Sequence, residues 1–237
     1  MEMTGCFAPV MYRSARRHVA ERSVLGALFL VCMLPLWAAE PATVSFSLNF
    51  PGSDPERYSI SVTADGDGRY ESSSKISQDS EDRDEYHSEF KFSDATRSRI
   101  FDLSAQAHYF SGKVDSGNHK LAFTGSKKLT YVDSQRNTTA EFNFSPVPPI
   151  QQLTTLFQSI AATLEFGRRL EYDHHYQKLA LDEELKRMED LSRRNELAEV
   201  QAVKPILQKI YDDPSVLNVV RARAQRIMDM SATPRAP

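Results

Sequence analysis

Cysteine and tryptophan are almost absent from this chain. Its 237 residues include two cysteines and one tryptophan, Cys6, Cys32 and Trp37, all within the first 39 positions. From residue 40 onward the chain therefore has no thiol that could act as a nucleophile, bind zinc or close a disulfide. Cysteine catalysis, thiolate metal sites and redox motifs are excluded together for that part of the protein.

Excess positive charge is lacking as well. The formal net charge is −3, and residues 1–39 contribute +2 of it (four arginines, two glutamates), which leaves −5 for the remainder. A general nucleic-acid-binding protein needs a basic surface, so this class is excluded. The most apolar run, Val24–Ala39, has sixteen residues, whereas a membrane-spanning helix needs roughly 20.

That apolar run follows a basic segment and ends in two alanines, which is the order of an export signal. Pro35 inside the run disfavours a continuous spanning helix. We therefore expect residues 1–39 to be a cleaved signal peptide. The alternative is a retained N-terminal anchor, because the bulky Trp37 lies where a small side chain is expected before the cleavage site. Both interpretations place the rest of the protein outside the cytoplasm, periplasmic or secreted, with membrane contact only through the N-terminal segment if it stays uncleaved.

A period of two dominates residues 40–145, the predicted β-rich region. Apolar and polar side chains alternate along Val44–Phe50, Tyr58–Val62 and Tyr86–Phe92. This pattern predicts half-buried strands with one wet face and antiparallel pairing. A helix is expected to interrupt the strands, capped by Ser93 and ending near His108.

Further strand signals follow this helix. Leu121–Phe123 and Leu129–Val132 flank Gly125-Ser126, which predicts a hairpin. Alternation returns along Thr139–Phe144, and Pro146–Pro149 then marks a predicted linker.

The period becomes helical over residues 150–230, and residues 231–237 are expected to be a disordered tail. Acidic residues precede basic ones at i,i+4 around Tyr176–Arg194, which is typical of a solvated helix face. Asp213-Pro214 predicts the start of the last helix. Its three arginines are expected to solubilise it: Arg221, Arg223 and Arg226.

These patterns predict an α+β fold. We expect an antiparallel, mostly meander sheet with one inserted helix, followed by a C-terminal helical segment. Because the helices have apolar stripes, that segment is expected either to pack on the sheet or to form a small helical extension.

Lys204–Met228 resembles a HEAT-type helical repeat. The residues that carry the resemblance are Pro205-Ile206-Leu207, Asp213, Val220-Arg221 and Ala224. The resemblance implies a helical pair that binds protein. Solenoids of this type need about three repeats to bury a core, and the chain has a single copy.

Fingerprints of catalysis or cofactor binding are lacking. The chain contains no HExxH, GxSxG, P-loop or dinucleotide motif, so we assign no catalytic, metal or cofactor-binding residue. Asp65–Gly68 lacks the later ligands of a calcium loop and predicts a tight turn. Adjacent His174 and His175 would point about 100° apart on a helix, so a role at a helix junction is favoured over metal binding.

Aromatic residues gather instead on one face of the predicted sheet. Nine form a candidate ligand surface: Phe46, Phe50, Tyr58, Tyr86, Phe90, Phe92, Tyr131, Phe142 and Phe144. A core filled by the C-terminal helices is the favoured interpretation, since those helices need an apolar surface to cover. The alternative is a cavity for an apolar small molecule.

Three functions remain open. The first is a non-enzymatic extracytoplasmic binding module with an envelope protein as its partner. The second is a carrier of a lipid or other apolar ligand between sheet and helices. The third is a hydrolase that uses carboxylate and histidine groups such as Glu85, His87 and His175.

Overall fold

The structure is a computed structural model that describes residues 40–75, 83–118 and 120–232. The expected signal peptide, residues 1–39, lies outside the described residues, as do residues 233–237 of the expected tail. The described residues form one compact unit.

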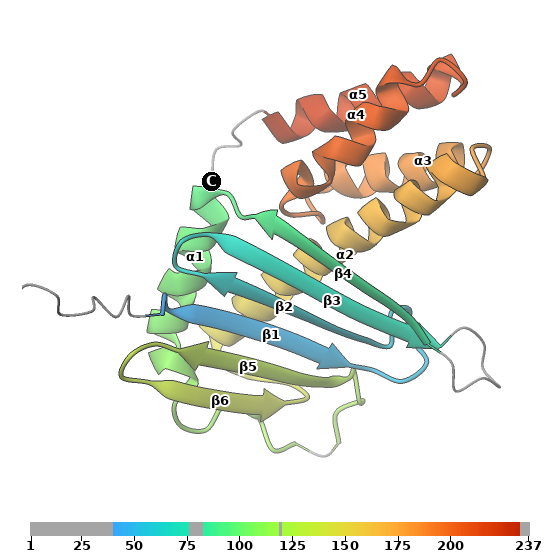
Figure 1. The fold of residues 1–237 in the computed structure, drawn as a ribbon. Coiled ribbons are helices and arrows are strands. Elements are labelled where there is room, and N and C mark those ends of the chain that lie inside the picture. The colour runs from blue at the N-terminus through green and yellow to red at the C-terminus, as the bar shows by residue number, and fades with distance from the viewer. Residues whose placement is uncertain (1–39, 76–82, 119, 233–237) are drawn as a thin grey trace, which may run out of the picture. The chain divides into compact units, whose positions relative to one another are not determined.

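A six-stranded antiparallel sheet is built in the order β4-β3-β2-β1-β5-β6 (Figure 1). The first four strands follow one another as a meander, and the β5–β6 hairpin is added on the other side of β1. The predicted α+β fold with a mostly meander sheet is confirmed. The strand bounds are β1 Thr43–Asn49, β2 Arg57–Thr63, β3 Asp67–Lys75, β4 Arg83–Lys91, β5 Ser126–Val132 and β6 Asn137–Phe142.

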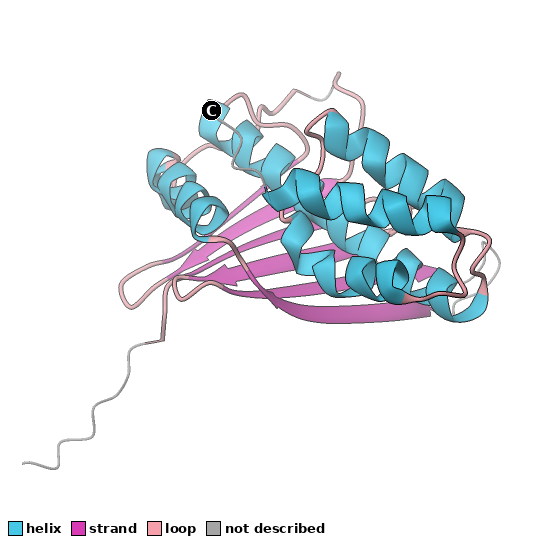
Figure 2. Ribbon diagram, turned by 90° about the horizontal axis from the view of Figure 1, so that it is seen from above, coloured by secondary structure: helices cyan, strands magenta, loops and turns pink. Residues whose placement is uncertain are grey.

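The alternation of side chains gives the sheet two different faces. Val44 and Phe46 of β1 are fully buried, while Ser45, which pairs with Ser61 of β2, lies on the opposite, partly exposed face. Figure 2 shows the helices on one side of the sheet. The apolar face is therefore covered by helices, and the serine-rich face is open.

Helix α1 (Asp94–Gln106) begins where the sequence predicted, because the Ser93 hydroxyl accepts a hydrogen bond from the Thr96 amide at 3.3 Å. Helix α2 begins inside the predicted linker, at Pro148, since proline suits the first turn of a helix. The helical segments after α1 are η1 His108–Phe110, α2 Pro148–Tyr176, α3 Leu181–Arg193, η2 Val200–Val203, α4 Lys204–Asp212 and α5 Asn218–Ala232.

Helix α2 packs on the sheet through both apolar and polar contacts. The rings of Phe46 and Phe157 stack with centroids 5.3 Å apart. Glu165 is buried, and its Oε1 accepts hydrogen bonds from the hydroxyls of Tyr70 (2.6 Å) and Ser72 (2.7 Å). Its Oε2 accepts one from Arg168 Nε at 2.8 Å. The buried carboxylate is thus fully paired, as burial of a charge requires.

Two sequence predictions about local structure are wrong. Leu121–Phe123 forms no strand but belongs to the long connection before β5, and β5 makes its hairpin with β6 instead. The last helix begins at Asn218 rather than Pro214. Asp213 does accept a hydrogen bond from the Ser215 amide (2.9 Å), but this contact shapes a turn between α4 and α5. The Asp-Pro signal is common to turns and helix starts, which explains the error.

The acidic residues of α3 are not all on a solvated face, contrary to prediction. Glu189 is 4 % exposed and accepts hydrogen bonds from Arg193 (2.5 Å) and from Arg226 of α5 (2.8 Å). Arg223 Nε lies 3.3 Å from the same carboxylate. Hydrogen bonds from Arg226, together with the surrounding positive charge, lower the pKa of Glu189. Two of the three arginines expected to solubilise the last helix therefore connect α5 to α3.

Candidate functional site

The nine aromatic residues of the candidate ligand surface have three different environments. Five lie in the core between sheet and helices: Phe46, Tyr58, Phe92, Tyr131 and Phe142. Tyr86 and Phe90 are partly buried and pack against this core. Phe50 and Phe144 lie past the ends of β1 and β6, where Phe50 contacts Phe123 and Phe144 is 44 % exposed.

Of the residues considered for hydrolysis, Glu85 and His87 share the open face of β4, whereas His175 belongs to helix α2. Glu85 and Glu89 lie on the open face of the sheet, where Glu85 accepts a hydrogen bond from Ser73 (2.8 Å) and Glu89 pairs with Arg69 (3.1 Å). His87 is exposed on the same strand, opposite Glu71. His175 belongs to α2, in the helical layer, and its ring meets Tyr176 edge-on at 4.3 Å.

The two adjacent histidines diverge. His174 Nε2 lies 3.0 Å from Asp213 Oδ2, whereas His175 contacts Tyr176. Asp65 and Gly66 form the turn between β2 and β3. Among residues 40–75, 83–118 and 120–232, no group of three or more histidine, cysteine, aspartate or glutamate side chains is placed to hold a metal ion.

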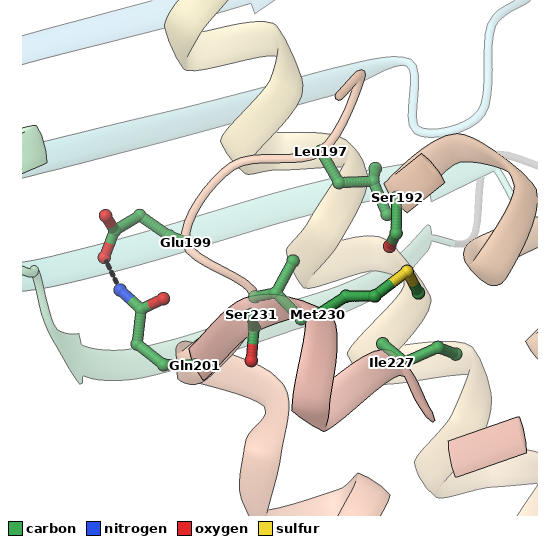
Figure 3. A pocket seen from close by; sticks show the side chains of 8 residues that line it. Ser192, Leu197, Glu199, Gln201, Ile227, Met230 and Ser231 are labelled. Carbon is green, nitrogen blue, oxygen red and sulfur yellow. Dashed lines mark hydrogen bonds between the residues drawn. The ribbon is translucent and has the colours of Figure 1, made fainter. Parts of the chain in front are cut away.

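A cavity of about 190 Å³ lies among α3, the segment around η2 and α5 (Figure 3). Its lining includes Leu197, Glu199, Gln201 and Met230. The Glu199 carboxylate is hydrogen-bonded to Gln201 and also accepts bonds from the Ser93 amide (2.9 Å) and hydroxyl (2.6 Å). Because these donors satisfy it, and because an anion at a helix start is favourable, Glu199 stabilises the beginning of α1.

Large apolar side chains are exposed in and near the connections α2–α3 and α4–α5. We call this group the turn surface; its members are Tyr172, Tyr176, Leu179, Leu217 and Val219. Leu179 is 86 % exposed and Tyr176 is 68 % exposed. Leu179 and Leu217 lie in the connections α2–α3 and α4–α5, whereas Tyr172 and Tyr176 end α2 and Val219 is in the first turn of α5. Clustered exposure of this type is typical of interaction sites, whereas single exposed apolar residues are ordinary.

Asp213 holds the two turns side by side. Its Oδ2 is hydrogen-bonded to His174 at 3.0 Å and accepts a hydrogen bond from Lys178 at 2.6 Å, both from the end of α2 or just beyond. Its Oδ1 accepts from the amide and hydroxyl of Ser215 in its own turn. Hydrogen bonds from Lys178 and Ser215 hold the pKa of Asp213 well below its usual range, so the carboxylate stays charged at neutral pH.

Two tyrosines of the turn surface are in contact with each other. The rings of Tyr172 and Tyr176, one helical turn apart, have centroids 5.0 Å apart. Asp173 lies between them in sequence, and burial raises the pKa of its carboxyl group. The apolar side chains of the turn surface therefore lie next to the polar contacts that Asp213 makes with both connections.

Sequence reasoning missed the turn surface because its members are far apart in the chain. Lys178 and Ser215, whose side chains bond at 2.5 Å, are separated by 37 positions. A local signal did exist, since Leu179 lies in the short connection between two helices and belongs to no apolar stripe. The contact with Asp213 agrees with the predicted helix-junction role of the Tyr172–Tyr176 segment.

Comparison with known proteins gives no match, either to a model of a protein family or to a curated protein sequence. In the described part of the chain, none of the helices combines the length and apolar character that crossing a membrane demands.

Proposed function

We propose that this protein is an exported, non-enzymatic interaction module and that an envelope protein docks on its turn surface. The observation that carries the proposal is that five exposed apolar side chains lie in or next to two connections that Asp213 joins. Fixed aromatic side chains are the usual centres of binding energy in protein interfaces, because they bury much area and lose little freedom.

Two sequence features support the proposal. The order of residues 1–39 is that of an export signal, which would bring the module to an envelope partner. The segment that resembles a HEAT-type repeat forms the helices α4 and α5, and the turn between them contributes Leu217 to the turn surface. A protein-binding role is what that resemblance implies.

The carrier hypothesis has less support. An apolar ligand between sheet and helices would need the volume where Phe46 stacks on Phe157 and where Ile60 and Leu129 are fully buried. Because these side chains are closely packed, we favour a filled core over a ligand cavity at the aromatic face.

The proposal is tested by capture of partners from envelope extract with matched variants. The double variant Tyr176→Ser/Leu179→Ser removes two exposed side chains of the turn surface, and Val132→Ser, at an exposed position of β5, is the control. We expect a specific envelope protein to be retained by the wild type and the control, and to be reduced about tenfold or more by the turn-surface variant. Equal recovery with both variants, or no specific protein in repeated captures, would contradict the proposal.

A further inference from the structure

A second group of exposed apolar side chains lies near the residues that follow β1 and β6. We call it the loop surface; it consists of Leu121, Phe123 and Phe144, which are 41, 58 and 44 % exposed. Leu121 and Phe123 belong to the connection between η1 and β5, and Phe144 follows β6. It shares no residue with the turn surface.

Hydrogen bonds fix the loop so that these side chains remain outside the core. Asn143 Nδ2 donates to the Ala122 carbonyl (3.0 Å), and its Oδ1 accepts from the Thr124 amide (2.9 Å). The buried ammonium of Lys127 donates to the carbonyls of Thr124 (3.1 Å) and Asn143 (3.0 Å). The Phe123 ring packs edge-on against Phe50 at 6.0 Å. The exposure of Leu121 and Phe123 is thus a property of an ordered loop.

The segment that carries Leu121 and Phe123 has more cationic than anionic residues. Lys113 and Lys120 are exposed and form no ion pair with any described residue, and Lys113 Nζ lies beside Gly117 of the same loop. Residues 111–128 contain four lysines and one acidic residue, Asp115, and Glu141 of β6 pairs with Lys128. In a chain that is acidic beyond residue 39, this surface has an excess of cations.

We propose that the loop surface, with Lys113 and Lys120, docks the protein on phospholipid bilayers that carry anionic headgroups. Leucine and phenylalanine on a projecting loop can enter the boundary between headgroups and acyl chains, while adjacent lysines remain among the headgroup phosphates. The excess of positive charge complements an anionic surface. Exposed apolar side chains next to lysines without an ion-pair partner are typical of proteins that bind membranes reversibly.

The experiment is flotation of the full, natively exported protein with vesicles of two compositions. One set is phosphatidylcholine alone, and the other contains about one third phosphatidylglycerol, which supplies the negative surface potential. The test variants are Leu121→Ser/Phe123→Ser and Lys113→Gln/Lys120→Gln. The matched controls are Val132→Ser, for an exposed apolar residue, and Lys204→Gln/Lys209→Gln, for exposed lysines on α4. Urea unfolding of every variant checks that the fold is retained.

We expect each test variant to lower partitioning onto the anionic vesicles about tenfold, with both controls unchanged. The lysine variant should match the wild type on phosphatidylcholine alone. Equal partitioning of all variants would overturn the proposal, because binding would then come from another part of the chain, including an uncleaved N-terminal segment. The proposal would also be overturned if the lysine variant lost binding to an acidic protein while flotation stayed unchanged in every variant, because the lysines would then serve a protein interface. Neither result depends on the turn surface, so failure of the two proposals can be distinguished.

Discussion

His174, near the end of α2, and Asp213, between α4 and α5, lie 3.0 Å apart from Nε2 to Oδ2, although 39 positions separate them in the chain. Lys178 approaches the same carboxylate oxygen at 2.6 Å. Two helical hairpins are thereby joined at their turns, and the apolar side chains beside this junction form the turn surface. The position of the proposed binding groups thus depends on one aspartate.

Asp213→Asn should loosen the turn surface while the sheet stays unchanged. The amide has no negative charge and a single oxygen to accept with, so its hydrogen bonds with Lys178 and His174 are weaker and the restraint between the turns is reduced. We expect faster hydrogen–deuterium exchange in residues 177–180 and 213–217 and unaltered exchange in β1 and β2. Asp212→Asn, one residue earlier and exposed, is the matched control. Unchanged exchange at both turns would show that Asp213 does not hold them together.

Tyr70→Phe should destabilise the contact between β3 and α2. The Tyr70 hydroxyl donates to the buried Glu165 carboxylate at 2.6 Å, and its loss leaves the charge with one donor fewer. Burial, reinforced by the charge of Glu165, raises the pKa of Tyr70 above its ordinary range, so the hydroxyl remains a donor at every working pH. We expect a loss of about 1–3 kcal/mol in the free energy of unfolding, measured by urea denaturation. Tyr176→Phe, which removes an exposed hydroxyl, should change it by less than about 0.5 kcal/mol; equal effects of the two variants would contradict the assignment.

Glu189→Gln should reveal a pH-dependent link between α3 and α5. Arg226 and its neighbours lower the pKa of Glu189 in the folded state. The stabilising contribution is therefore complete above the carboxyl group's ordinary pKa, about 4.5, and is lost as pH falls through the lower value of the folded state. At pH 7 we expect the variant to be less stable than the wild type by about 1–2 kcal/mol.

The comparison at low pH gives this prediction its sharpest check. The stability difference between wild type and Glu189→Gln should shrink as the pH falls below about 4.5. Glu183→Gln, on an exposed position of the same helix, should show a small difference at both pH values. If the stability difference between wild type and Glu189→Gln stayed constant between pH 7 and pH 3, the charge of Glu189 would not contribute to stability.

Local patterns were sufficient to predict most of the fold. Alternation located β1 and β2, and Ser93 located the start of α1, because both depend on neighbours in sequence. The prediction failed at Leu121–Phe123, where a short apolar run is compatible with either a strand or a fixed loop. The loop conformation is fixed by hydrogen bonds of Asn143 to Ala122 and Thr124. Because Asn143 is about 20 positions away, these contacts leave no signal in the local sequence pattern.

The candidate surfaces were less predictable, for a related reason. Glu189 and Arg226 each look like ordinary surface charges until packing of α3 on α5 brings them to 2.8 Å. The exposure of Leu179 and Leu217 in the same place also depends on how two helical hairpins pack. Sequence periodicity reports which face of one helix is apolar, but not which turns lie side by side.

Site-specific photo-crosslinking at position 176 tests the central claim most directly. A photoreactive phenylalanine analogue in place of Tyr176, in cells that export the protein, would lie within the turn surface, and the same analogue in place of Lys204 would report on an exposed control position of α4. We predict a discrete protein adduct from position 176 that is absent from position 204 and disappears when Leu217→Ser is added. The same adducts at both positions, or none at position 176, would contradict the account.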